Sequence, residues 1–160
     1  MQLYMKQKMW SFKQDFDIYD ENQRPVYRVD SKLISFGRKT KILDVQSGQV
    51  LCEVNQKVFS LFPTVDVIQE GEFFCRIRKQ FTFFKPKYSV QGVDWVVDGS
   101  IFEHDYTIWD SNGDKIARIK KKFLAWSDTF EMDIKNEEVD TVLILATILA
   151  IDLAMDLSSN

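Results

Sequence analysis

The stretch Val142-Leu-Ile-Leu-Ala-Thr-Ile-Leu-Ala-Ile151 is the longest apolar run of the chain, and Thr147 alone interrupts it. From Glu137 to Leu157 there is no glycine or proline, and apolar residues cover the whole circumference of a helix drawn over these residues. A helix that is apolar on every side must be surrounded by protein, and a run of about ten residues is half of what a membrane span needs. The sequence therefore predicts a buried helix over 137–157.

The part of the chain before this helix predicts strands. From Phe16 to Ile134 apolar and polar residues alternate, and glycine or a polar cluster separates successive segments, which is typical of hairpins. Asn112-Gly113 predicts a type I′ turn, in which both central residues need a positive φ. Hairpins that must surround a helix favour a sheet curled around it, since closure also removes exposed strand edges. We expect a β-rich (α+β) fold, a closed antiparallel β-barrel wrapped around a central hydrophobic C-terminal helix, in a single domain over 1–160.

Composition and charge exclude several classes of protein. With 45% hydrophobic, 14% aromatic and 28% charged residues, the chain has the composition of a folded domain. A formal net charge of -3 gives no global basic field of the kind that binds nucleic acid. Cys52 and Cys75 fall in different predicted strands and are expected to be buried side chains rather than a disulfide or a metal pair. Because 1–13 lacks the apolar core of a secretory signal, we expect a cytoplasmic location. We also expect a monomer, and no transmembrane segment because the longest apolar run is too short.

Five segments carry a resemblance to a known family, and their order along the chain makes it distinctive. They are Met5-Lys-Gln-Lys-Met9, the strand-turn-strand 17–29, Tyr88-Ser-Val-Gln-Gly92, the segment 102–119 that begins Phe102-Glu-His-Asp, and the apolar helix 140–152. Together they resemble the LURP-one-related family over nearly the whole chain. That family is related in structure to the C-terminal domain of tubby proteins and to phospholipid scramblases. The resemblance implies a tubby-like barrel of about twelve antiparallel strands around the C-terminal helix, and it supplies no catalytic residues and no cofactor.

Basic residues on predicted strands are the candidate ligand site. In the run 118–122, alternation places three cations on one strand face and Lys121 on the other, and three cations on one face could hold a phosphate. The resemblance to tubby-like domains suggests phosphoinositide headgroups, and the following Phe123, Leu124 and Trp126 suit a membrane interface. The predicted strand that contains Arg76, Arg78 and Lys79, and the cluster 38–41, could extend the patch if they lie nearby. Otherwise all these cations are the solvated outer face of the barrel. The candidate ligand-binding residues are Arg118, Lys120, Lys122, Arg76 and Arg78.

Enzymatic and metal-binding constellations are not found in the sequence. The single histidine, His104, lies between two acids and is expected to be a surface or capping residue, and no Gly-x-Ser-x-Gly elbow, glycine-rich phosphate loop or Cys-x-x-Cys occurs. Aspartates in several turns could hold calcium but are also favoured there for backbone hydrogen bonding. Asp140 fits a helix N-terminus, whereas Asp152 and Asp156 are expected at the wet end of the barrel. We expect no enzyme, no cofactor and no metal site.

An aromatic segment offers one further possibility. Phe81, Phe83, Phe84 and Tyr88 surround Lys85-Pro86-Lys87, a mixture that can stack and neutralise single-stranded nucleic acid. We expect instead that Phe81 and Phe83 share one strand face in the barrel core and that the proline marks a turn or an edge. Nucleic acid is therefore not an expected partner.

The sequence as a whole predicts a non-enzymatic binding or regulatory module. The leading hypothesis is reversible, peripheral contact with anionic phospholipid headgroups at a membrane surface through the strand 118–122. The alternative is a protein–protein interaction module with no lipid affinity. Salt separates the two, because headgroup binding depends on phosphate neutralisation and an aromatic protein interface does not.

Overall fold

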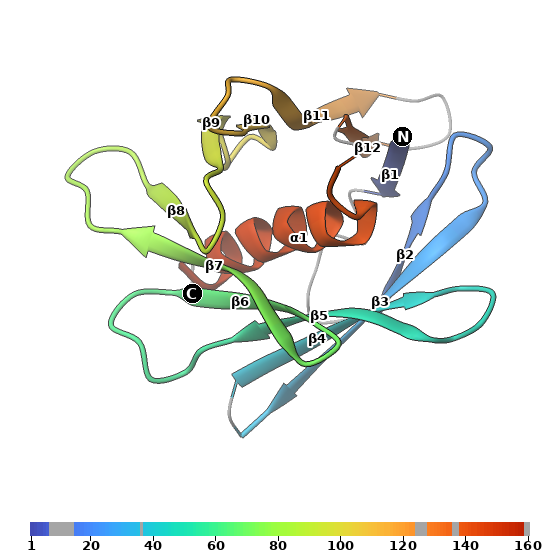
Figure 1. Ribbon diagram of the computed structural model, residues 1–160, viewed down its shortest axis with the longest axis horizontal. Helices are drawn as coiled ribbons and strands as arrows, with labels where there is room; N and C mark the ends of the chain where they lie inside the picture. Colours follow the sequence, from blue (N-terminus) through green and yellow to red (C-terminus); the bar gives the residue numbers. More distant parts are fainter. Residues whose placement is uncertain (7–14, 36, 124–127, 136–137, 159–160) are drawn as a thin grey trace.

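The computed structural model describes residues 1–6, 15–35, 37–123, 128–135 and 138–158 (Figure 1). Within these residues it contains twelve strands and one helix. The elements are β1 (Gln2–Lys6), β2 (Phe16–Tyr19), β3 (Pro25–Ile34), β4 (Gly37–Asp44), β5 (Val50–Gln56), β6 (Thr64–Gln69), β7 (Glu72–Gln80), β8 (Lys87–Gln91), β9 (Val96–Ser100), β10 (Asp105–Trp109), β11 (Lys115–Phe123), β12 (Asp128–Ile134) and α1 (Thr141–Ser158).

All twelve strands form one antiparallel sheet, in the order β8-β7-β6-β5-β4-β3-β2-β1-β12-β11-β10-β9. The sheet curls around α1 (Figure 1). β1 pairs with β12 from Gln2 opposite Asp133 to Lys6 opposite Thr129, so the first and last strands are neighbours. β8 and β9 are the two edges of the sheet, and no backbone ladder joins them within the described residues. The predicted barrel around a C-terminal helix is confirmed, nearly closed, with a seam between β8 and β9.

The helix is buried as its apolar circumference predicted. α1 begins at Thr141 rather than at residue 137, and every residue from Ile144 to Ala154 is buried. Its length and composition would allow it to cross a membrane, yet 72% of it is buried inside the protein. Asp140 caps its N-terminus, because the Oδ1 atom accepts a hydrogen bond of 3.0 Å from the backbone N–H of Val142. The expected position of Asp140 is confirmed.

The inward faces of the strands supply the rest of the core. The period-two pattern is clear on β7, where Cys75 and Ile77 are fully buried and Arg76 and Arg78 lie on the outer face, half-buried. Both cysteines are buried free thiols, as expected. Burial raises the pKa of Cys52 to about 12 and that of Cys75 to about 11, so neither forms a thiolate at neutral pH.

Antiparallel pairing sorts the connections between strands into two ends of the barrel. Successive connections lie alternately at opposite ends, so those after β3, β5, β7 and β9 share one end and those after β2, β4, β6, β8 and β10 share the other. We call these the loop end and the turn end. In Figure 1 the β5–β6 and β7–β8 connections extend to the left and the β2–β3 and β4–β5 connections to the right. α1 runs from the turn end toward the loop end, where the hydroxyls of Tyr88 and Ser158 are 3.1 Å apart.

Aspartates organise the turns at the turn end. The Asp110 carboxylate accepts hydrogen bonds from the N–H groups of Asn112 and Asp114, both at 2.9 Å, and Asp20 and Asp44 act in the same way on their own turns. Such aspartates stabilise turns without a metal, and the described residues contain no group of three metal-ligating side chains. The predicted turn position at Asn112-Gly113 is right but its type is wrong, because Gly113 has a φ of 83° and Asn112 does not have a positive φ.

Candidate functional site

The predicted basic strand lies on the outer face of the barrel, and its cations are paired within the protein. Arg118 contacts Asp105 and donates to the carbonyl oxygens of Tyr106 and Ile119 at 2.9 and 2.8 Å. The ammonium groups of Lys120 and Lys122 lie 3.3 and 2.7 Å from the carboxylate oxygens of Glu131, which is opposite Lys120 on β12. Leu124 and Trp126, which the sequence placed beside these cations, lie outside the described residues.

Glu131 fixes the electrostatics of this strand. Its side chain is only 4% exposed, and burial alone would raise its pKa, but hydrogen bonds from Lys122 and Lys120 outweigh burial and lower the pKa. Glu131 is therefore ionised at neutral pH. Three cations pair with two acids, Asp105 and Glu131, so these five side chains together carry a formal charge of only +1 (3 − 2).

The structure does not bring the second candidate pair to this strand. Arg76 and Arg78 lie on β7, and the sheet order separates β7 from β11 by β8, β9 and β10 on the side of the seam. Arg76 forms a two-bond pair with Asp66, at 2.7 and 3.1 Å. The five candidate residues thus form two separate groups, and most of their charges have an internal partner.

A different group of cations lies at the loop end. The segments 32–39, 56–64 and 79–87 contain the β3–β4, β5–β6 and β7–β8 connections, whose strands are consecutive in the sheet, and they include no aspartate or glutamate. Their seven cations are Lys32, Arg38, Lys39, Lys57, Lys79, Lys85 and Lys87. Lys39, Lys57, Lys85 and Lys87 are exposed and form no ion pair with any residue in the described ranges. Of the basic groups singled out in the sequence, the cluster 38–41 contributes Arg38 and Lys39 to this surface, and the aromatic segment contributes Lys85 and Lys87.

The opposite end of the same strands is acidic. The turn-end segments 20–25, 43–50 and 68–73 contain five acids and one cation, Arg24. The acids are Asp20, Glu21, Asp44, Glu70 and Glu72. Over β3 to β8, charge is therefore separated along the strands, with cations at the loop end and acids at the turn end. The β9–β10 connection, also at the loop end, carries Glu103 and is followed by Asp105. Sequence reasoning missed this separation because it treated each basic run as part of one strand and did not assign the connections to ends.

The loop end also exposes large apolar side chains. Phe81 and Phe83 were expected in the barrel core, but they are 69% and 85% exposed, so that prediction is wrong. β7 ends at Gln80, and the following residues form a loop in which Thr82 Oγ1 donates to the carbonyl of Lys85 at 2.7 Å. Alternation at 81 and 83 therefore reflects a loop and not a strand.

A polar cluster is buried inside the barrel near the C-terminal part of α1. Asp152 was expected at the wet end but is fully buried, with Oδ1 3.4 Å from Nε2 of His104, whose side chain is 14% exposed rather than a surface group. Burial raises the pKa of Asp152 and that of Tyr106, and burial lowers the pKa of His104 to about 4. These shifts favour the uncharged form of each of the three side chains, and no nucleophile with an adjacent base is seen among the described residues.

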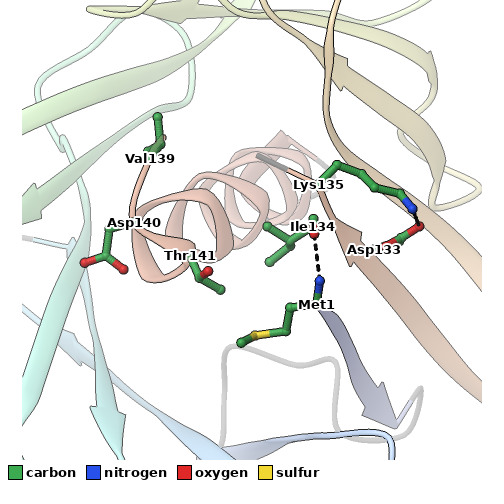
Figure 2. Close-up of a pocket in the computed structure, with 7 residues that line it drawn as sticks. All are labelled: Met1, Asp133, Ile134, Lys135, Val139, Asp140 and Thr141. Carbon is green, nitrogen blue, oxygen red and sulfur yellow. Dashed lines mark hydrogen bonds and ion pairs between the residues drawn. The ribbon is translucent and has the colours of Figure 1, made fainter. Parts of the chain in front are cut away.

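Cavities of the described structure lie at the turn end and along the seam. A cavity of about 530 Å³ lies at the turn end beside the start of α1 (Figure 2). Most of its polar groups have partners: the Met1 amino group donates to the Ile134 carbonyl at 2.9 Å and Lys135 pairs with Asp133 at 2.9 Å (Figure 2). Asp140 caps the helix. A second cavity, of about 490 Å³, lies along the seam between β8 and β9.

Three comparisons relate the chain to known proteins. A family model described as LURP-one-related matches residues 1–152. The chain is 32% identical over 155 residues to the protein named Uncharacterized protein YxjI of Bacillus subtilis (strain 168), covering 97% of this chain and 94% of that protein. It is similar to the X-ray structure of a protein from Arabidopsis thaliana, AT5G01750, with a TM-score of 0.66 and 16% identity over 98% of this chain and 90% of that one. The structural likeness concerns the fold alone.

Proposed function

We propose that this chain, which belongs to the LURP-one-related family, is a non-enzymatic binding module that contacts anionic phospholipid headgroups reversibly at a membrane surface. The observation that carries the proposal is the separation of charge along the barrel axis. Three neighbouring acid-free segments hold seven cations at the loop end, and the opposite end of the same strands is acidic.

Electrostatics gives this arrangement an orientation as well as an attraction. A lysine near an anionic bilayer contributes on the order of 1 kcal/mol, and the attraction decays within about 8 Å at physiological salt. Only the loop end is attractive at that range, while the acidic turn end is repelled. The protein would therefore dock with the loop end toward the membrane, and the C-terminal end of α1 would point toward the membrane.

The proposal moves the contact from the strand 118–122 to the connections. Lys120 and Lys122 would have to give up Glu131, a nearly buried carboxylate, before they could bind a phosphate. Leaving a buried charge without its partner costs more than an exposed contact returns. Lys57, Lys85 and Lys87 have no such partner within the described residues and can bind phosphate at no internal cost.

Co-sedimentation with vesicles tests the proposal. Wild-type protein should pellet with phosphatidylcholine vesicles that contain phosphatidylserine, more at low than at physiological salt, and should not pellet with phosphatidylcholine alone. Lys85→Glu/Lys87→Glu should abolish pelleting. The matched control is Lys41→Glu/Lys115→Glu, two exposed lysines outside the loop end that give the same change in net charge. Equal loss in both double variants, or no pelleting of the wild type, would reject the loop end as the contact.

A second candidate function is favoured by the seam. β8 and β9 present sheet edges that are not joined by a ladder, beside a cavity of about 490 Å³. An extended segment of a partner protein could add to either edge through main-chain hydrogen bonds. This protein-interaction function predicts binding that is insensitive to salt. Because Lys85 and Lys87 also line the seam cavity, salt dependence and not Lys85→Glu/Lys87→Glu separates the two functions.

A further inference from the structure

The most exposed large apolar side chains of the described structure gather on two adjacent connections at the loop end. Phe59 and Leu61 in the β5–β6 connection are 91% and 86% exposed, and Phe83 and Phe84 in the β7–β8 connection are 85% and 97% exposed. We call these four side chains the apolar crown. Exposed apolar groups that cluster in this way mark a contact surface more often than scattered ones do.

The bases of the two connections are held together, so the crown is presented by an ordered platform. The Lys79 N–H donates to the carbonyl of Pro63 at 3.0 Å, and the Lys57 N–H donates to the carbonyl of Thr64 at 2.9 Å. Phe81 links the two connections, with its ring centroid 6.5 Å from that of Phe62 and 5.2 Å from that of Phe83. The backbone that carries the crown is therefore ordered before binding, so little backbone conformational entropy would be lost when the crown enters another phase.

The charges around the crown identify that phase as an anionic bilayer. Lys57 precedes Phe59 by two residues, Lys85 directly follows Phe84, and Lys87 lies two residues beyond Lys85. No acid occurs in either connection or in the strand residues that flank it. Proteins that lie at membrane interfaces share one arrangement. Their aromatic side chains lie in the acyl boundary, and their ammonium groups lie at the level of the phosphates.

We infer that Phe59, Leu61, Phe83 and Phe84 enter the acyl boundary of an anionic bilayer beneath the headgroups that the loop-end lysines bind. This inference rests on the proposed function and deepens it, since electrostatic contact alone requires no penetration. The lysines then set the salt dependence of binding and the crown sets the depth.

A fluorescent probe at residue 84 tests penetration. Cys52 and Cys75 are buried with raised thiol pKa values, so a thiol-reactive, environment-sensitive dye should label Phe84→Cys selectively. On vesicles of phosphatidylcholine and phosphatidylserine, its emission should shift to the blue, and lipids brominated on the acyl chain should quench it. The matched control is Phe73→Cys, 53% exposed at the turn end, whose dye should show neither effect.

A second variant keeps the inference testable without labelling. Phe83→Ser/Phe84→Ser should weaken vesicle binding at least about tenfold while leaving the salt dependence unchanged, because the burial of apolar side chains is not screened. Salt-dependent binding without acyl-chain quenching, and with unchanged affinity in this variant, would overturn penetration while the proposed function stands. Failure of the unmodified protein to bind anionic vesicles would overturn both. Quenching at residue 73 instead of residue 84 would also overturn the inference.

Discussion

Asp152 is the residue whose surroundings differ most from its sequence-based expectation. It was assigned to solvent because carboxylates near the end of a chain are usually solvated, yet it is fully buried beside His104. The sequence contained a signal, since Leu153 and Ala154 continue the apolar circumference beyond it. What the sequence could not supply is the position of His104, which a positive φ of 52° in the β9–β10 connection directs toward the helix.

The first prediction concerns Asp152→Asn. The folded-state pKa of Asp152 is raised by burial, so folding takes up a proton; the residue favours folding below its unfolded pKa, near 3.8, and this contribution is lost as pH rises toward the folded pKa. Asparagine cannot ionise and removes that loss. The stability of the variant relative to the wild type should therefore increase as pH rises from 5 to 8, by up to roughly 1.4 kcal/mol for each pH unit of rise while the pH is below the folded pKa. Urea unfolding at both pH values measures it, and an equal effect at both would contradict the buried, protonated state.

The second prediction concerns Glu131→Gln. Its lowered pKa means that its contribution to stability is present above the unfolded value, near 4.5, and is lost as pH falls through the folded value. At pH 7 the variant should lose about 1–3 kcal/mol, because Lys120 and Lys122 lose their shared carboxylate. Glu103→Gln, an exposed acid without an ion pair among the described residues, should be nearly neutral. Thermal unfolding of the two variants compares them, and matching melting temperatures would contradict the account of Glu131.

At the scale of elements, the helix and most strands could be predicted from periodicity, and the connections could not. The helix followed from an apolar circumference, although its first turn starts at Thr141, after the cap at Asp140, instead of at residue 137. Phe81 and Phe83 have the spacing of a strand, but the local hydrogen bond from Thr82 to Lys85 forms a turn there in place of strand pairing, and both rings are exposed. Periodicity reports which residues could share a face, and it does not report whether a neighbouring strand is there to pair.

The third prediction concerns the start of α1. Asp140→Ala removes the acceptor for the Val142 N–H and the contact from Gln69 at 3.2 Å. Loss of an N-cap costs about 1 kcal/mol, and Asp140→Asn should retain most of the stability because asparagine also caps helices well. Chemical denaturation of the three proteins gives the comparison. Equal destabilisation by alanine and asparagine would argue that charge rather than capping is at work.

At the scale of the whole molecule, the order of strands converts local charge into a directional property. Cations at 32–39, 56–64 and 79–87 are separated along the chain by acidic turns, so the sequence read linearly has mixed charge. Antiparallel pairing collects the cations at one end and the acids at the other. The candidate site therefore could not be found without the topology, although the composition of each connection was visible from the start.

The central claim is that the loop end faces an anionic membrane, and a lysine-labelling footprint tests it on unmutated protein. Acetylation by a water-soluble reagent, quantified by mass spectrometry, is compared with and without vesicles that contain phosphatidylserine. The account predicts protection of Lys39, Lys57, Lys85 and Lys87, with Lys41 and Lys115 labelled as in solution. Protection of Lys120 and Lys122 without protection of the loop-end lysines would contradict it. Labelling of the four loop-end lysines that is unchanged by vesicles, under conditions where the protein is bound, would also contradict it.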